Sequence, residues 1–304
     1  MRISIIIPAH NEEKYLAQCL ASFVRQTIKP NELIIIDDNS SDNTFKIASN
    51  FAEAHSWIKA FQRKSSDEHI PGKKVVDTFN YGLKKASEYD LIGKFDADII
   101  LPPNYFEQMR NHFQSNWKLG MCAGLLYIEK KGEWIYENIA NKSHIRGPIK
   151  LYHKACFTKI GGLRPATGWD TVDTLLAKYH NFETLTDPDL IVKHLRHLGQ
   201  DYKTKNYYAK GEALYKMRYD IVLAKLAALK MAWSIKSPRM YIQIIFGYLG
   251  AFLQNQPNFV TKEEGRFIRK LRWKNILLNL NDFWLILIKT NYQKRNSFKN
   301  KYYK

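Results

Sequence analysis

The chain has 304 residues, 45% of them hydrophobic and 13% aromatic, which describes a folded globular protein and excludes a disordered one. Its three cysteines are too few and too widely spaced for a disulfide framework or a cysteine metal site. The N-terminal apolar run meets charge too early for a secretory signal, and the longest apolar stretch, at 240–253, is shorter than the ~20 residues of a membrane-spanning helix. We therefore expect a cytoplasmic protein that does not cross a membrane.

The net charge of +18 is unevenly distributed along the chain. Residues 203–304 hold 21 Lys and Arg against 5 Asp and Glu, a balance of +16, whereas residues 1–202 hold 26 against 24, a balance of +2. Such a change in composition predicts a domain boundary near residue 203. We therefore expect one domain over 1–202 and a second, strongly basic region over 203–304.

The first 200 residues alternate between strand and helix patterns. Short, continuously apolar runs predict buried strands, and apolar residues at helical spacing predict helices between them. In chain order these are a strand at 3–9, a helix at 13–27, a strand at 32–38, a helix at 44–54, a helix at 74–90 and a strand at 91–98. This alternation predicts an α/β fold, with a doubly wound, mostly parallel sheet covered by helices on both faces.

Polar clusters sit at the carboxyl ends of three of the predicted strands. They are His10-Asn11-Glu12, Asp37-Asp38-Asn39 and Asp96-Ala97-Asp98. In doubly wound sheets, ligands bind beyond the carboxyl ends of the strands. A single acidic strand end has no special meaning, but three in one sheet predict a binding site.

The residues in these clusters indicate which ligand the site holds. A glycine-rich phosphate loop of the GxGxxG or GxxxxGK[ST] type is missing from the sequence, which argues against nicotinamide or P-loop chemistry. Asp96 and Asp98 fall on one face of a strand, where two like charges repel unless a cation lies between them. Carboxylates suit Mg²⁺ or Mn²⁺, which also neutralises a diphosphate, and Asp37 or Asp38 is suited to bind a base or ribose. The pattern therefore predicts a nucleotide-sugar site.

Four motifs in order resemble the inverting GT-A glycosyltransferases of family 2. They are PAHNEE at 8–13, IIIDDNSSDNT at 34–44, GKFDADIILPPNYF at 93–106 and KIGGLRPATGWDTVD at 159–173. The resemblance covers residues 1 to about 200. It implies metal-dependent transfer of a sugar from a nucleotide-diphosphate sugar, with UDP favoured, to a hydroxyl of a glycan or lipid-linked acceptor. Synthesis of bacterial surface polysaccharide is the implied role.

The resemblance also assigns residues to the donor side of the site. Asp98 becomes the principal ligand of Mn²⁺ or Mg²⁺, with Asp96 beside it in a DxD motif. Asp38 binds the base and Asp37 supports its turn. The other implied donor-site residues are Pro8, Ala9, His10 and Glu12 along the nucleotide, and Lys73 or Lys74 as a basic donor-binding residue.

The acceptor side is assigned through the last motif. Asp170 aligns best with the family's general base, although Trp169 replaces the acid that usually precedes it, and Asp173 lies one helical turn further on. The alternative for Asp170 is a helix N-cap. His194 falls where relatives carry a histidine near the metal or the diphosphate; its alternative is a strand histidine without a ligand.

The basic region predicts helices and a second kind of contact. Ser237-Pro238 has the pattern of an N-cap followed by proline, and Thr261 to Glu264 forms a capping box. We expect three or four helices, with FWLILI at 283–288 in the last. Basic charge among aromatic residues suggests adsorption to an anionic membrane, on the inner face of the bacterial cell membrane. The alternative is a solvated basic surface over an ordinary helical core.

Three other functions compete with hydroxyl glycosylation. A nucleic-acid-binding module would explain the basic region but not the acidic strand ends, so we expect no nucleic-acid partner. A non-catalytic, nucleotide-binding member of the same fold would explain the missing acid before Asp170. Transfer to a polyprenyl phosphate would need little base catalysis, because that acceptor is already an anion.

Overall fold

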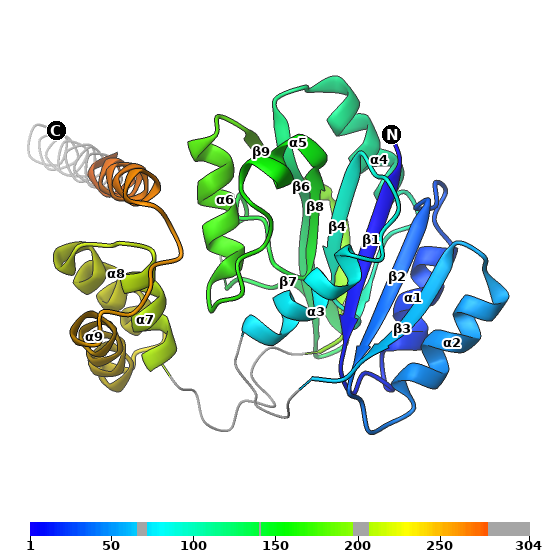
Figure 1. Ribbon diagram of the computed structural model, residues 1–304, viewed down its shortest axis with the longest axis horizontal. Coiled ribbons are helices and arrows are strands. Elements are labelled where there is room, and N and C mark those ends of the chain that lie inside the picture. Colours follow the sequence, from blue (N-terminus) through cyan, green and yellow to red (C-terminus); the bar gives the residue numbers. More distant parts are fainter. Residues whose placement is uncertain (66–71, 140, 197–206, 279–304) are drawn as a thin grey trace, which may run out of the picture. The chain divides into compact units, whose positions relative to one another are not determined.

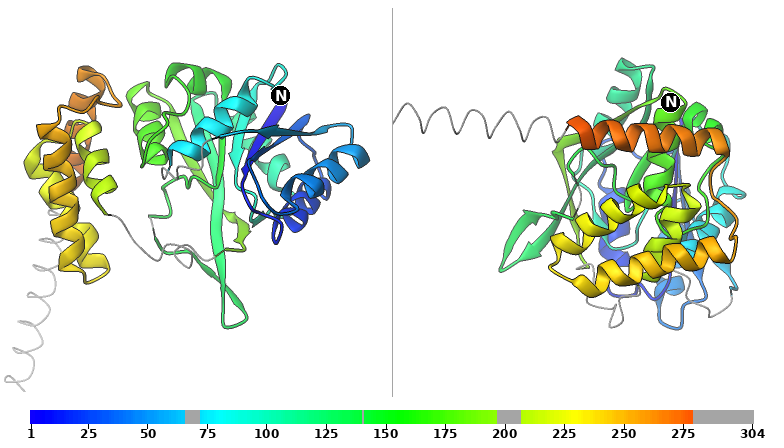
Figure 2. Two further views of the ribbon diagram at one scale, coloured as in Figure 1. Left: turned by 60° about the horizontal axis from the view of Figure 1, so that its bottom comes forward. Right: turned by 90° about the vertical axis from the view of Figure 1, so that its left-hand side faces the viewer.

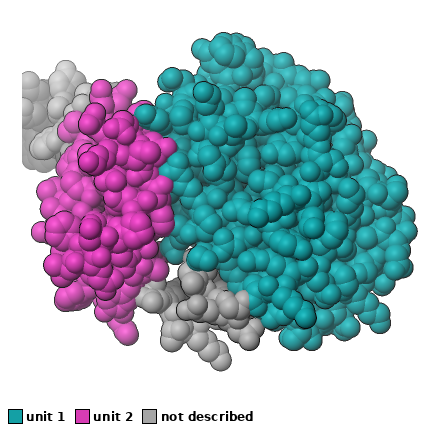
Figure 3. Space-filling model, viewed as in Figure 1, with its two compact units in different colours: residues 1–205 teal, residues 206–304 magenta. Residues whose placement is uncertain are grey.

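The structure is a computed structural model that describes residues 1–65, 72–139, 141–196 and 207–278 (Figure 1). The chain forms two compact units, Met1–Lys205 and Asn206–Lys304 (Figure 3). The division lies close to the change in composition at residue 203.

Unit 1 is built on a nine-stranded mixed sheet in the order β3-β2-β1-β4-β8-β6-β9-β5, with β7 paired to β6. Strands β3, β2, β1 and β4 are parallel, whereas β8 runs antiparallel to β4 and β6. The strands are β1 (Ile3–Ala9), β2 (Glu32–Asp38), β3 (Ile58–Arg63), β4 (Leu91–Phe95), β5 (Ile99–Ile100), β6 (Leu119–Lys130), β7 (Glu133–Tyr136), β8 (Ile149–His153) and β9 (Glu183–His194).

Helices cover both faces of this sheet, which confirms the predicted α/β architecture (Figures 1 and 2). They are α1 (Leu16–Val24), α2 (Thr44–Ala54), α3 (Lys73–Leu83), α4 (Tyr105–Ser115), α5 (Lys154–Lys159) and α6 (Trp169–Tyr179). On one face, Phe23 of α1 packs against Phe95 and Phe106, with ring centroids 5.8 and 5.7 Å away. On the other, Phe79 of α3 packs against Phe157 of α5 at 6.1 Å. Burial of these rings fixes the helices to the strands.

The parallel strands end level with one another, which brings their following loops together. Ala9 at the end of β1 pairs with Asp37 of β2. Just beyond these strands, Asn11 and Asn39 both have left-handed backbones, with φ of 54° and 61°. Asparagine tolerates this conformation better than most residues, so it suits the sharp turn that each loop makes.

The strand predicted at 91–98 ends earlier than expected. Strand β4 stops at Phe95, and residues 97–98 form a turn. The reason is topological: β4 lies in the middle of the sheet, whereas β5, which follows at once, pairs with β9 at its edge. The chain must turn between the two, so Asp96 and Asp98 lie in that turn and not within a strand.

Unit 2 consists of helices in its described part. They are α7 (Tyr208–Lys216), α8 (Ile221–Ser234), α9 (Pro238–Leu253) and helical residues 262–278. The Ser237 hydroxyl accepts the Met240 N–H, and Thr261 and Glu264 bond to each other's backbone N–H, which confirms both predicted caps. The predicted helix at 283–288 lies outside the described residues. No described helix has the length and apolar character that crossing a membrane requires.

Helices α7 and α9 approach so closely that glycine is required at their crossing. A Cβ on Gly211 would lie 1.9 Å from the Ile244 carbonyl oxygen, and one on Gly247 would lie 2.1 Å from the Tyr208 carbonyl oxygen. Both obstacles are backbone atoms, which cannot move aside as a flexible side chain does. By contrast, a Cβ on Gly250 of α9 would meet nothing within 4 Å.

Gly247 and Gly250 both belong to α9, so they give a matched test of the close crossing with α7. We expect Gly247→Ala to destabilise unit 2 by about 1–3 kcal/mol through overpacking. Gly250→Ala should stabilise it by about 0.5–1 kcal/mol, because alanine is the better helix former. Thermal unfolding followed by circular dichroism measures both. Equal effects of the two substitutions would contradict the close crossing.

Candidate active site

The loops after β1 and β2 are joined by direct hydrogen bonds. The His10 Nδ1–H donates to the Asp38 carbonyl oxygen over 2.7 Å, and the Asn11 N–H donates to the Ser40 hydroxyl over 2.9 Å. The Glu12 N–H donates to the Thr44 hydroxyl at the start of α2 over 2.7 Å. The residues predicted to border the nucleotide, from Pro8 onward, therefore share one edge with the Asp37–Asp38 pair.

Asp37 and Asp38 are buried, with 1% and 2% of their surface exposed. Asp38 Oδ2 accepts from the Thr78 hydroxyl over 2.7 Å, and Asp37 Oδ2 accepts from the Gln62 amide over 3.4 Å. The Oδ1 atom of each aspartate is buried without a hydrogen-bond donor among the described residues. Buried carboxylate oxygens are nearly always bonded, so these two are places for donors of a ligand.

The first turn of α3 lies against the segment that precedes α6. Gly72 has φ of 77°, and a Cβ there would lie 2.6 Å from the Ala166 carbonyl oxygen. Lys73 is exposed and paired with Asp77 at 2.8 Å, while Lys74 is half-buried. The predicted lysines of the donor site therefore begin a helix that borders the segment just before the predicted base.

The DxD aspartates differ in their partners. Asp96 is paired with Lys94, a buried lysine of β4, and its N–H donates to the Pro148 carbonyl oxygen over 2.9 Å. Asp98 is 7% exposed, and its Oδ2 lies 3.6 Å from His194 Nε2 and 3.5 Å from Arg196 Nε. Its Oδ1 is buried and has no donor among the described residues. The two aspartates thus lie in a turn that is surrounded by basic side chains.

The pairing of β5 with β9 places His194 beside this turn. His194 is opposite Ile99 in the ladder, and its Nδ1 lies 3.4 Å from Glu137 Oε2. Burial would lower the pKa of His194, but the contacts with Asp98 and Glu137 outweigh burial and raise this pKa to about 9. The imidazole is therefore protonated at neutral pH. In this state it is a charged partner of both Asp98 and Glu137.

Arg196 connects Asp98 to the first loop. Its Nη2 lies 2.5 Å from Glu12 Oε2, while its Nε faces Asp98. Burial, and next the negative charge of Asp98, raise the pKa of Glu12 to about 8, an effect that Arg196 offsets only in part. Burial also opposes ionisation of Asp98, but His194 and Arg196 outweigh it and lower the pKa of Asp98. Asp98 therefore stays a carboxylate.

The carboxylates of Asp96 and Asp98 suit a hard divalent cation whose other ligands come partly from the phosphates of a bound substrate. Among the described residues, no three or more His, Cys, Asp or Glu side chains form a ready-made metal cluster. Mg²⁺ and Mn²⁺ do not need one, because one or two carboxylates together with substrate phosphates suffice. The buried, unpartnered Oδ1 of Asp98 is a fitting ligand atom for such a cation.

Asp170 lies in the first turn of α6 and is half-buried. The helix is capped by Gly168, in the left-handed conformation, so Asp170 is not the N-cap that one reading of the sequence suggested. Its Oδ2 lies 3.8 Å from His144 Nε2. Burial would raise the pKa of Asp170, but the contact with His144 and the charge of Lys150 outweigh burial and lower this pKa to about 2.

Asp173, the second predicted base, is buried and fully engaged. Its carboxylate oxygens lie 2.7 and 2.9 Å from Lys150 Nζ, and Oδ2 accepts from the Tyr152 hydroxyl over 2.5 Å. Lys150 also donates to the Asp170 carbonyl oxygen over 2.5 Å. Burial raises the pKa of Asp173, and Lys150 opposes that rise. The structure thus brings Asp170 and Asp173 onto one helix turn but gives them different surroundings.

Trp169 lies close to two buried lysines. The Nζ atoms of Lys94 and Lys150 are each 5.4 Å from the centre of its ring, a cation–π distance. Neither lysine was among the predicted site residues. The available signal was a lysine inside each of two otherwise apolar, strand-like runs, GKF at 93–95 and IKLY at 149–152. Glu137 was likewise not predicted, because only the tertiary structure brings it to His194.

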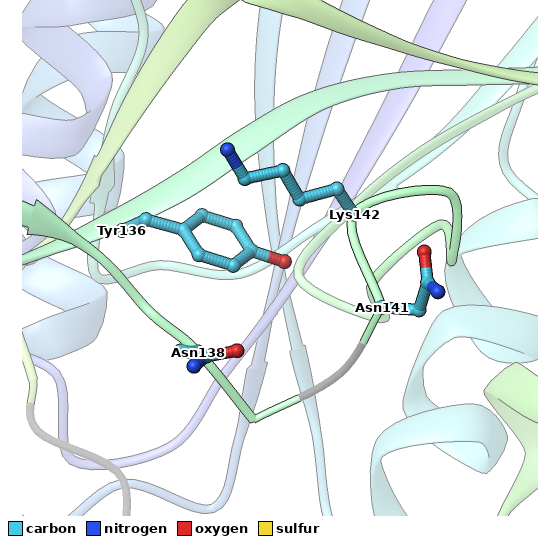
Figure 4. Close-up of a pocket in the computed structure, with 4 residues that line it drawn as sticks. All are labelled: Tyr136, Asn138, Asn141 and Lys142. Atoms are coloured by element: carbon cyan, nitrogen blue, oxygen red, sulfur yellow. The ribbon is translucent and has the colours of Figure 1, made fainter. Parts of the chain in front are cut away.

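An open, polar pocket lies on the His144 side of the site. It has a volume of about 570 Å³ and is lined by Tyr136, Asn138, Asn141 and Lys142 (Figure 4). Lys142 Nζ lies 5.2 Å from the centre of the Tyr136 ring. The backbone N–H of His144 donates to the Asn141 carbonyl oxygen over 2.8 Å. This bond links the pocket to the histidine whose side chain contacts Asp170.

The buried Lys150–Asp173 pair should carry much of the stability at this end of unit 1. Asp173→Asn leaves the Lys150 ammonium buried without its counter-charge, so we expect the free energy of unfolding to fall by about 3–5 kcal/mol in urea denaturation. Asp77→Asn is the control, because Asp77 is also paired with a lysine but at the surface. That change should cost no more than about 0.5 kcal/mol. Equal losses would show that burial of the pair is unimportant.

Comparison with known proteins gives a consistent result. The family model of glycosyl transferase family 2 matches residues 4–165, more than half of the chain. Putative glycosyltransferase EpsH of Bacillus subtilis is 27% identical over 155 residues, 51% of this chain and 42% of that protein. Poly-beta-1,6-N-acetyl-D-glucosamine synthase of Staphylococcus epidermidis is 30% identical over 153 residues, 50% of this chain and 32% of that protein. The chain therefore spans less than half the length of these relatives.

Solved structures share the fold at low sequence identity. S. aureus TarS in complex with UDP-GlcNAc has a TM-score of 0.60 at 17% identity, covering 84% of this chain and 82% of that one. Mannosyltransferase PcManGT from Pyrobaculum calidifontis, in complex with GDP-Man and Mn²⁺, has a TM-score of 0.54 at 14% identity, covering 93% and 87%. With the family match, they confirm the resemblance seen in the four motifs. The chain therefore belongs to glycosyl transferase family 2 and is by family a glycosyltransferase of the GT-A fold.

Proposed function

We propose that the chain is a metal-dependent inverting glycosyltransferase that uses a nucleotide-diphosphate sugar, with UDP favoured, and a hydroxyl of a glycan or lipid-linked acceptor. One observation carries this proposal. Among the described residues, Asp37 and Asp38 at the end of β2 and Asp98 in the turn after β4 each present a buried carboxylate oxygen without a hydrogen-bond donor. Such oxygens are costly in the free protein and are explained by a ligand that supplies donors and a cation.

On the donor side, the Asp37–Asp38 pair accepts hydrogen bonds from the base or ribose, and the loop from Pro8 to Glu12 borders the nucleotide. Lys73 and Lys74, at the start of α3, supply positive charge to the donor. Asp98, with Asp96, holds Mn²⁺ or Mg²⁺. When bound, the metal neutralises the diphosphate and stabilises it as a leaving group. His194 adds a positive charge beside Asp98, since its pKa of about 9 keeps it protonated.

On the acceptor side, Asp170 is our proposed general base. Its carboxylate is partly accessible and, with a pKa of about 2, ionised at all physiological pH values. It accepts the proton of the acceptor hydroxyl as that oxygen attacks the anomeric carbon from the side opposite the diphosphate, which inverts the configuration. Asp173 has both oxygens engaged by Lys150 and Tyr152, which favours a supporting role. The polar pocket beside His144 suits the hydroxyl groups of a sugar acceptor.

The setting that we propose is bacterial surface polysaccharide synthesis, at the cytoplasmic face of the cell membrane. Poly-beta-1,6-N-acetyl-D-glucosamine synthase and chondroitin synthase of Escherichia coli are among the similar proteins. The excess of basic residues over 203–304 supports peripheral attachment to an anionic membrane.

Nucleotide binding is the first test. We expect calorimetry with UDP, GDP and CDP to show Mn²⁺-dependent binding of one nucleotide, because its diphosphate completes the metal's ligands. Asp98→Ala should weaken that binding at least about tenfold, since even outer-shell changes at metal sites have effects of this size. Asp189→Ala, an exposed aspartate of β9, serves as the control. Absence of binding by all three nucleotides with metal would overturn the proposed function.

The turnover rate of Asp170 variants tests the proposed general base. We expect Asp170→Asn to lower kcat by about 10²–10⁴-fold while nucleotide affinity is unchanged, because only proton transfer is lost. Since the base form of Asp170 persists down to a pH of about 2, the wild-type rate should show no loss from protonation of the base between pH 8 and pH 5.

Asp173→Asn, assayed where it remains folded, should retain most of its turnover. Full activity of Asp170→Asn with loss in Asp173→Asn would reverse the assignment. Full activity of both would instead favour an anionic acceptor such as a polyprenyl phosphate, which needs no base.

A further inference from the structure

Helix α8 carries an apolar stripe on its exposed surface. Val222, Leu226, Leu229 and Trp233 follow the spacing i, i+4, i+7 and i+11, which places them in one row along a helix. All four are exposed, and Trp233 is 81% exposed. Large side chains in such a row are usually buried, so an exposed row indicates a surface that meets something else.

The stripe is not the side of α8 that packs within the protein. Ala224, Ala228 and Ala232 form a separate row at i, i+4 and i+8, and all three are buried. The helix is therefore apolar on two sides. Its alanine row serves the fold, and the stripe of larger side chains is left for another contact.

Helix α9 repeats the same arrangement. Ile242, Phe246, Leu249 and Leu253 again follow i, i+4, i+7 and i+11, and all are exposed, Leu253 at 81%. The other side of α9 holds the buried Ile244 and the close crossing with α7. Two adjacent helices thus each carry a row of apolar side chains that the described residues leave exposed.

Every charged residue within α8 and α9 is basic. Lys225 and Lys230 are exposed, and the helical repeat places one on each side of the α8 stripe. Between Asp220 and Glu263 the sequence contains no acidic residue, whereas it contains basic residues at positions 225, 230, 236, 239 and 262. Lysines at the edges of an apolar row can extend their ammonium groups sideways to anionic groups while their stems remain with the apolar residues.

We propose that the α8 and α9 stripes are the surface through which the protein lies on an anionic lipid bilayer. The apolar rows enter the boundary between headgroups and acyl chains, Trp233 lies at that boundary, and the flanking lysines meet lipid phosphates. A purely apolar protein interface would explain the rows but not the basic residues at their edges. This inference rests on the proposed peripheral location and names the face responsible.

The test is flotation of the full chain with vesicles of phosphatidylcholine, with and without phosphatidylglycerol. We expect binding that requires the anionic lipid. Trp233→Ser in α8 and Phe246→Ser in α9 should each lower the partition coefficient about tenfold or more, because each removes a large apolar side chain from the lipid. Lys225→Gln combined with Lys230→Gln should reduce the preference for phosphatidylglycerol.

Trp117→Ser is the matched control. Trp117 lies in unit 1, is 85% exposed and also has a lysine, Lys118, over its ring. This substitution removes the same side chain from an equally exposed position, so we expect wild-type flotation. Circular dichroism and nucleotide calorimetry verify that every variant is folded and that the donor site is unaffected.

Each other outcome overturns part of the proposal. Wild-type flotation that neither stripe variant reduces would place lipid contact elsewhere in the chain and reject this face. Absence of wild-type flotation would reject the peripheral location itself, while leaving the transferase proposal to the calorimetric test. Stripe variants that change the mass in solution, with unchanged flotation, would identify a second copy of the chain as the occupant.

Discussion

The site depends on the neutralisation of two buried lysines. Lys94 of β4 and Lys150 of β8 are direct partners in the antiparallel ladder, so two positive charges lie side by side on a buried face of the sheet. Neither charge is tolerable there without an acid. Asp96 is paired with Lys94, and Asp173 with Lys150, and the Trp169 ring lies within cation–π distance of both lysines. The requirement for charge balance therefore fixes both the DxD turn and the first turn of α6.

This constraint joins the donor side of the proposed site to the acceptor side. Asp96 belongs to the turn that carries Asp98, and Lys150 holds the backbone of Asp170 as well as the side chain of Asp173. A displacement of one lysine would disturb both carboxylates of the proposed chemistry. Rigid placement of reacting groups is what transfer between two bound substrates requires, because small misplacements reduce rates strongly.

Much of this arrangement was predictable from sequence, and the exceptions share a physical reason. The strands at 3–9 and 32–38 agree with β1 and β2, because continuous apolar runs are a local signal. The end of β4 was misjudged, because its position depends on where β5 pairs, which is a property of the whole sheet. Glu137 and His144 were missed for the same reason: their roles arise from contacts with His194 and Asp170, distant in sequence. Motif spacing predicted the acids of the candidate site, but not Lys94 and Lys150, which balance the charges of Asp96 and Asp173.

The unpartnered oxygens of Asp37, Asp38 and Asp98 have a consequence for engineering. Asp37, whose carboxylate accepts among the described residues only from the Gln62 amide at 3.4 Å, is a site where replacement by an apolar or amide side chain would raise the melting temperature of the free protein, whereas loss of Asp98 would also remove the counter-charge of His194 and Arg196. A screen for thermostability alone would therefore enrich variants that have lost the donor site. Selection for a robust enzyme has to be coupled to ligand binding, or confined to positions such as Gly250 that lie away from the strand ends.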